Sequence, residues 1–111
     1  MEQSELFGEL KSLGMPVTYS HFTVTEKNPA PAPPFITFQF AYSSDMIADN
    51  QNYVDVGNYQ VELYTTKKDL ATEKKVQDKL KELGLPYSKL ESWLDDEKMY
   101  QILYEIQLIG A

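Results

Sequence analysis

His21 is the only histidine of the chain and the first residue to consider for catalytic chemistry, because imidazole can exchange a proton near neutral pH. The hydroxyl groups of Tyr19, Ser20 and Thr23 lie close to it in the sequence. A general base also needs a nucleophile within reach and a further group that orients it. No catalytic motif surrounds these residues, and we interpret His21 as a structural residue in a strand.

A second group of polar residues could supply oxygen ligands to a metal ion. Asp45, Asp49, Asn50 and Asn52 lie in one short segment. Calcium needs roughly six to eight oxygen ligands on a loop whose turn is made by glycine. The segment contains no glycine and lacks the EF-hand spacing, so we predict a solvated hairpin tip that holds no metal.

Three consecutive acids, Asp95 to Glu97, are the last candidates for acid–base chemistry. Adjacent acids between two strand-like segments are typical of a polar surface turn. The chain also has no cysteine, phosphate-binding loop, dinucleotide fingerprint, nucleophile elbow or zinc-ligand spacing. The sequence therefore predicts a protein that is not an enzyme, with no catalytic residue and no cofactor.

Two helices are predicted, at residues 3–13 and 69–83, because apolar residues recur there at spacings of three and four. Ser4 is the expected N-cap of the first helix, and Asp69 is that of the second. Each helix ends at a Gly-X-Pro sequence, which stops a helix and favours an extended chain. Charged side chains, Glu73 among them, are expected to cover the outer face of the second helix.

The two helix ends resemble each other in sequence. Residues 10–17 and 80–87 share two leucines, a glycine, an apolar residue and a proline in the same positions. Either an α–β unit has been duplicated, or both segments use a common way to end a helix and begin a strand. Both explanations support the two helix–strand boundaries.

Five strands are predicted from β-branched and aromatic residues and from alternating polarity. They cover residues 17–24, 35–42, 53–66, 87–94 and 98–109. Four of the six prolines lie in residues 26–34, which we expect to form a stiff loop. Residues 43–52 are expected to form a polar hairpin tip. We expect these two loops to be the most mobile parts of an isolated monomer.

The alternation within the strands assigns their faces. Every second residue from Ile36 to Tyr42 is expected to share one face. Gly57 interrupts the third strand and indicates a bulge. Leu103 and Ile109 interrupt the polar face of the last strand, which predicts that this face is partly covered.

The predicted order of elements is α-β-β-β-α-β-β. The helices occur singly, and several strands are joined by connections that look like hairpins. This pattern predicts one α+β domain over residues 1–111, with a mainly antiparallel sheet and two helices packed on one face. The expected core joins helix and strand residues: Leu6, Leu10, Leu13, Val76, Leu80, Leu83, Ile36, Phe38, Val61, Leu63, Ile102 and Ile106.

The composition fits a single folded domain. Of the 111 residues, 42% are hydrophobic and 24% are charged, which suffices for one core and not for two. Ten cations against 17 acids give a net charge of −7, and every cation is a lysine. Sequence-specific nucleic-acid recognition favours arginine and a basic surface, so that class is excluded. No segment approaches the roughly 20 apolar residues of a membrane helix, and we expect a protein made in a cytoplasm with no membrane partner.

Eight tyrosines are the clearest indication of how the protein acts. Tyrosine is enriched at protein interfaces because it buries a large ring and keeps a polar end. Ordinary packing within half-buried strands explains the same residues equally well. A small acidic domain with many strand aromatics and no active site fits a binding or assembly role.

The segment from Tyr59 to Asp69, followed by Glu73-Lys74-Lys75 and Leu80, resembles a signature of small proteins from the structural gene clusters of phages and prophages of Gram-positive bacteria. Three further motifs fit the same family: Pro34-Phe35-Ile36, Ala48-Asp49-Asn50 with Tyr53, and Tyr100-Gln101-Ile102-Leu103-Tyr104-Glu105. The resemblance covers nearly the whole chain and rests on packing and turn motifs.

That family is similar to the tail terminator and tail-completion proteins of long-tailed bacteriophages. The resemblance implies an α+β domain that assembles as a ring, typically a hexamer, at the head-proximal end of the tail tube in the virion. Such a ring stops tail polymerisation and joins head to tail. The implied partners are further copies of the chain, the major tail protein and a head-closure or connector protein. These rings often form only on the growing tail, so the isolated protein is expected to be a monomer.

The alternative is a soluble non-enzymatic adaptor that binds a peptide along a sheet edge. Closing a ring requires one patch of each subunit to meet a different patch of the next. We expect the contact with another subunit or with the tail tube at the hairpin tip and at exposed aromatics of the long strand. The candidate residues are Asp45, Asp49, Asn50, Asn52, Tyr53 and Tyr64.

Overall fold

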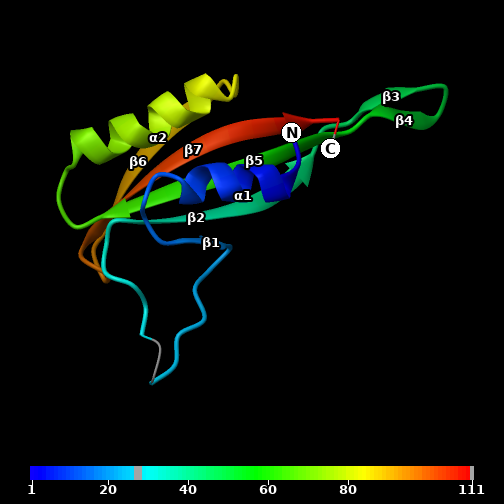
Figure 1. Ribbon diagram of the computed structural model, residues 1–111. Helices are drawn as coiled ribbons and strands as arrows, with labels where there is room; N and C mark the ends of the chain where they lie inside the picture. The colour runs from blue at the N-terminus through cyan, green and yellow to red at the C-terminus, as the bar shows by residue number, and fades with distance from the viewer. Residues whose placement is uncertain (27–28, 111) are drawn as a thin grey trace.

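The computed structural model describes residues 1–26 and 29–110, which form two helices, a five-stranded sheet and a smaller two-stranded sheet (Figure 1). Residues 27 and 28, within the loop predicted at 26–34, and residue 111 lie outside the described residues. The elements are α1 (Gln3–Lys11), β1 (Val17–Tyr19), β2 (Phe35–Ser43), β3 (Met46–Ala48), β4 (Gln51–Val54), β5 (Val56–Thr65), α2 (Leu70–Glu82), β6 (Ser88–Leu94) and β7 (Met99–Ile109).

The five-stranded sheet has the order β1-β2-β5-β7-β6. Only β1 and β2 are parallel, and the other neighbours are antiparallel. The predicted α+β class, the mainly antiparallel sheet and the order of the main elements are confirmed. Within that order, the third predicted strand is divided into β4 and β5, and β3 is an additional short strand.

Both helices pack on the same face of the sheet and build the core there. The apolar residues that α1 and α2 bury belong to the predicted stripes, whereas Leu13 and Leu83 of those stripes lie at the margin of the core. Three buried hydrophobic residues were not in the predicted core: Leu85, Tyr104 and Leu108. The buried hydrophobic residues of the strands are Ile36, Phe38, Val61, Leu63, Ile102, Tyr104, Ile106 and Leu108.

The two helix starts differ in how well the sequence predicted them. Asp69 caps α2 as expected, since its Oδ1 accepts a hydrogen bond from the Thr72 amide at 3.1 Å. The N-cap of α1 is Glu2, so the prediction of Ser4 was wrong. The Glu2 amide donates to Glu5 Oε1 at 3.4 Å, and the Glu5 carboxylate also suits the positive end of the helix.

Two predicted positions need correction, the first because of a local backbone turn and the second because two lysines outside α2 pair with Glu73. The strand predicted at 17–24 ends at Tyr19, because Ser20 adopts a left-handed conformation (φ 66°) that turns the chain away from β2. His21 therefore follows the strand and does not lie in it. Glu73, expected on the outer face of α2, is only 1% exposed.

The bulge predicted at Gly57 lies instead on the neighbouring strand. Gly57 pairs with β2 and β7 without an extra residue, whereas Ala41 is inserted between the paired positions Phe40 and Tyr42. This insertion moves the Tyr42 side chain to the sheet face opposite the helices, so its predicted place beside Phe40 was wrong. The glycine at 57 has a different reason, since an added Cβ would lie 3.0 Å from the Tyr59 ring.

Candidate assembly interface

Residues 46–54, here called the arm, form a hairpin of β3 and β4 that extends past the end of the main sheet (Figure 1). Asp49 and Asn50 both have positive φ, 52° and 61°, as a tight two-residue hairpin turn requires. The segment predicted as a polar tip is therefore two short paired strands. Its predicted mobility stays a prediction.

Asp45 fixes the base of the arm. Its Oδ2 accepts a hydrogen bond from Asn52 Nδ2 at 2.6 Å, and its Oδ1 accepts one from the Val56 amide at 2.8 Å. The bond from the Val56 amide, followed by that from Asn52, holds the pKa of Asp45 below its ordinary value. Asp45 and Asn52 thus serve the arm itself, and the structure does not present them as free contact groups.

The arm exposes three large apolar side chains. Met46 is 59% exposed, Ile47 69% and Tyr53 73%. Tyr53 is among the predicted contact residues, whereas Met46 and Ile47 were not predicted. The signal that could have found them is an apolar pair inside an otherwise polar segment. Isolated exposed apolar residues are common, but three on one small hairpin suggest a surface that is covered in an assembly.

Tyr64 lies apart from the other candidate residues. It is paired with Phe35 at the opposite end of β5, about 35 Å of extended chain from Tyr53. Its ring stacks on that of Phe35 with 4.9 Å between centroids, and its hydroxyl donates to Glu62 Oε2 at 2.6 Å. Burial, with the neighbouring Glu62 carboxylate, raises the pKa of Tyr64. The six predicted residues therefore do not form one site.

Glu62 organises the sheet face opposite the helices, here called the polar face. Glu62 is 8% exposed, and the side chains that donate hydrogen bonds to its carboxylate in the described part of the chain are all neutral. Besides Tyr64, these donors are Thr37 (3.3 Å), Gln39 (3.2 Å) and Gln101 (3.1 Å). The network holds side chains of three neighbouring strands in place, so the polar face is ordered before any partner binds.

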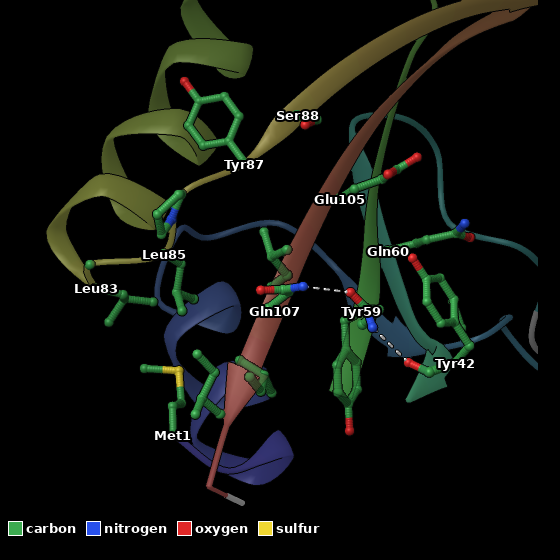
Figure 2. A pocket seen from close by; sticks show the side chains of 17 residues that line it. Met1, Tyr42, Tyr59, Gln60, Leu83, Leu85, Tyr87, Ser88, Glu105 and Gln107 are labelled. Atoms are coloured by element: carbon green, nitrogen blue, oxygen red, sulfur yellow. Dashed lines mark hydrogen bonds between the residues drawn. The ribbon is translucent and has the colours of Figure 1, made fainter. Parts of the chain in front are cut away.

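A cleft of about 670 Å³ lies between the end of β7 and the segment that follows α2 (Figure 2). Gln107 donates to Asn58 at 3.0 Å on its wall, and Asn58 donates to the Tyr42 carbonyl oxygen at 3.1 Å. Among the described lining residues, Glu105 carries the only side-chain carboxylate, and no lysine or histidine accompanies it. The cleft therefore offers a shape to a partner and no constellation of catalytic groups.

His21 is exposed and lies away from this cleft, with its Nδ1 3.3 Å from Ser20 Oγ. Over residues 1–26 and 29–110, no group of three or more histidine or acidic side chains is arranged to hold a metal ion. No helix in the same part of the chain is long and apolar enough to span a membrane.

The sequence matches no protein-family model, and no curated protein is significantly similar to it.

The role of Asp45 gives a first testable prediction. Replacing Asp45 with alanine removes the acceptor of both the Asn52 and the Val56 hydrogen bonds, so amide exchange should speed up across residues 46–54 while the sheet core keeps its protection. Hydrogen–deuterium exchange resolved by residue measures both regions. Asp96→Ala, an exposed acid in a distant turn, is the control. Unchanged exchange in the arm would show that Asp45 does not hold it.

Proposed function

We propose that this protein is a tail terminator or tail-completion protein of a long-tailed bacteriophage or prophage, and that it acts as a non-enzymatic virion structural protein. The arm is the observation that carries the proposal. It extends beyond the sheet and exposes three apolar side chains, an arrangement that gives a monomer no packing energy. In a ring, the same side chains are buried against the next subunit or the tail tube.

The body supplies the second surface that a ring needs. In a heterologous contact the arm of one subunit meets a different patch of its neighbour. The cleft is our candidate for that patch, because Tyr42 and Ile109 on its wall are 62% and 57% exposed. The molecule is elongated, with dimensions of 50 × 31 × 26 Å, and this shape supports a contact in which the arm extends to a neighbouring subunit.

The charge of the chain is compatible with this role. A net charge of −7 without any arginine gives little attraction for DNA, as suits a ring through which DNA passes. The partners in this proposal are other copies of the chain in a hexameric ring, the major tail protein, and a head-closure or connector protein. The protein would be made in the host cytoplasm and would be located in the virion at the head-proximal end of the tail.

Deletion of the gene from its phage tests the proposal. Without a terminator, tail tubes should grow beyond their normal length, and heads and tails should remain unattached. Electron microscopy of the lysate measures both, and a plasmid copy of the gene should restore normal virions. Tails of normal length already joined to heads would refute the proposed role.

One observation favours the alternative, an adaptor that binds a peptide along a sheet edge. β6 has a β7 neighbour on one side, and no described strand pairs with its other side. An added peptide strand could hydrogen-bond to that free backbone. The deletion experiment separates the two functions, because an adaptor outside the tail has no reason to control tail length.

A further inference from the structure

The edge of the main sheet formed by β6 has an unusual sequence. Six of the seven residues of β6 are exposed, among them Leu90 at 54% and Trp93 at 48%. Charged side chains on an edge strand ordinarily prevent association with another copy. The charges of β6 instead favour association, because in two antiparallel copies of the strand each positive charge lies opposite a negative one.

The residues Ser88-Lys89-Leu90-Glu91-Ser92 read the same in both directions except that the charge changes sign. In an antiparallel pair of two β6 strands centred on Leu90, each Lys89 lies opposite Glu91 of the second copy. Leu90 then faces its own equivalent, and Ser88 faces Ser92. Opposite charges and apolar pairs at directly opposed positions stabilise antiparallel strands.

Neighbouring registers lack this complementarity. A two-fold axis perpendicular to the sheet keeps each residue on its own face, so opposed positions must be an even number of residues apart. Moving the axis to Lys89 places the two Lys89 side chains opposite each other, and moving it to Glu91 does the same for two carboxylates. The register centred on Leu90 is therefore favoured over both of these.

The side chains that would meet are already oriented by the fold. Lys89 Nζ lies 2.6 Å from Glu73 Oε1, and Glu91 forms an ion pair with Lys68. Both are thus held on the helix side of the sheet, where each retains partial exposure. In the proposed pair, Lys89 of each copy would meet Glu91 of the other, so these ion pairs would be extended without bringing like charges together.

The exposed tryptophan fits the same register. Trp93 lies opposite Tyr87 of the second copy when the axis passes through Leu90. Within one chain, Trp93 packs on Tyr100 with 4.8 Å between ring centroids, and Tyr87 packs on Tyr104 with 5.3 Å. An aromatic pair would therefore form at each end of the shared strand pair.

We propose that the free protein self-associates through β6: an antiparallel β6–β6 pair joins two copies into one continuous ten-stranded sheet, with the helices of both copies on the same side. The inference concerns the protein before assembly and does not depend on the role in the tail; it replaces the expectation that the isolated protein is a monomer. A single pair of edge strands buries less than the roughly 1,200 Å² of a standard interface, so the dimer is weak and depends on concentration. High salt weakens it further by screening the Lys89–Glu91 pairs.

Cysteine cross-linking tests the register directly, because the chain contains no cysteine of its own. In the Leu90→Cys variant the two sulfur-bearing residues face each other with Cα atoms about 5 Å apart, within disulfide range. In the Ser92→Cys control they lie about 13 Å apart and should not cross-link. A mixture of Ser88→Cys and Ser92→Cys should give the mixed dimer. All three positions are exposed, so the fold is expected to tolerate them.

Charge placed on the axis gives an independent test. Leu90→Lys and Leu90→Glu each put two like charges opposite each other, so each variant alone should be a monomer. Their 1:1 mixture should form a heterodimer at concentrations where the wild type dimerises. Analytical ultracentrifugation across a concentration series measures this, and circular dichroism checks that both variants fold.

A wild-type monomer at every concentration would overturn the proposal and leave β6 free for a strand of another protein. Equal cross-linking of Leu90→Cys and Ser92→Cys would also overturn it, because random collision explains that result. Cross-linking confined to Leu90→Cys and to the Ser88→Cys and Ser92→Cys mixture would support it.

Discussion

Replacing both lysines that pair with Glu73, as Lys68→Met and Lys89→Met, is expected to lower the free energy of unfolding at pH 7 by about 3 kcal/mol. The Glu73 carboxylate is 1% exposed, and the two ammonium groups lie 2.7 and 2.6 Å from it. An uncompensated buried charge costs about 3–5 kcal/mol, and the partial exposure of both lysines places the loss at the lower end. Urea denaturation measures the change.

The pH dependence of this loss in stability follows from the direction in which the fold shifts the pKa of Glu73. Burial raises the pKa of Glu73, but the ammonium groups of Lys68 and Lys89 outweigh it and hold the pKa below its ordinary value. In the wild type, this carboxylate therefore stabilises the fold above about pH 4.3, and the contribution is lost as the pH falls through the lowered value. In the double lysine variant, burial acts on the Glu73 carboxylate without the compensating ammonium groups. The loss of stability should therefore be largest at neutral pH and should fade toward pH 4.3.

A third substitution serves as the matched control. Adding Glu73→Met to the double lysine variant gives a triple variant without the buried charge. Its free energy of unfolding at pH 7 should return to within about 1 kcal/mol of the wild type. Equal instability of the double and triple variants would contradict the ion-pair explanation. It would show that the methylene groups of the lysines matter instead, through their packing.

Placing charge on the arm, as Ile47→Asp with Tyr53→Asp, is expected to abolish complementation of the gene deletion while the domain stays folded. Both side chains are mostly exposed in the monomer, so their loss removes little internal packing. If each is a hot spot worth about 2 kcal/mol in the ring, binding weakens about 30-fold for each and on the order of 1,000-fold for both. Plaque counts and electron microscopy of tails measure the effect.

The control uses an exposed leucine of the body. Leu70 on α2 is 68% exposed, close to the exposure of the two arm residues, so Leu70→Asp makes an equivalent surface change elsewhere. It should complement as well as the wild type. Wild-type complementation by the arm variant would exclude the arm as the contact surface, even if deletion of the gene itself gave overlong tails.

The two helix ends show what local sequence determines. Gly14 and Gly84 both adopt left-handed backbone angles, with φ of 86° and 70°, and each is followed two residues later by proline. A residue without a Cβ takes this conformation at low cost, and proline cannot continue a helix. The stripes of α1 and α2 and the alternation of β5 and β7 are similarly local, because the period of the backbone fixes which side chains share a face. These features could be predicted, and with them the class of the fold.

Features that depend on a neighbouring strand or helix became visible only in the folded chain. The inserted Ala41 sends Tyr42 to the polar face, and no pattern within 35–42 reveals it because the bulge is defined only against β5. Glu73 is typical of an exposed helix residue in sequence, yet Lys68 and Lys89 reach it from outside α2 and make its burial tolerable.

The candidate site divides in the same way. A hairpin between the second and third predicted strands followed from local sequence, because paired strands need a turn and Asp49-Asn50 tolerate positive φ. Local sequence could not separate Tyr64 from Tyr53, since both belong to one long strand-like segment and only pairing with β2 shows them at opposite ends. It also could not show that Asp45 turns inward and Met46 and Ile47 turn outward. Which side of a short strand meets solvent depends on what packs against it, and that is settled only when the chain has folded.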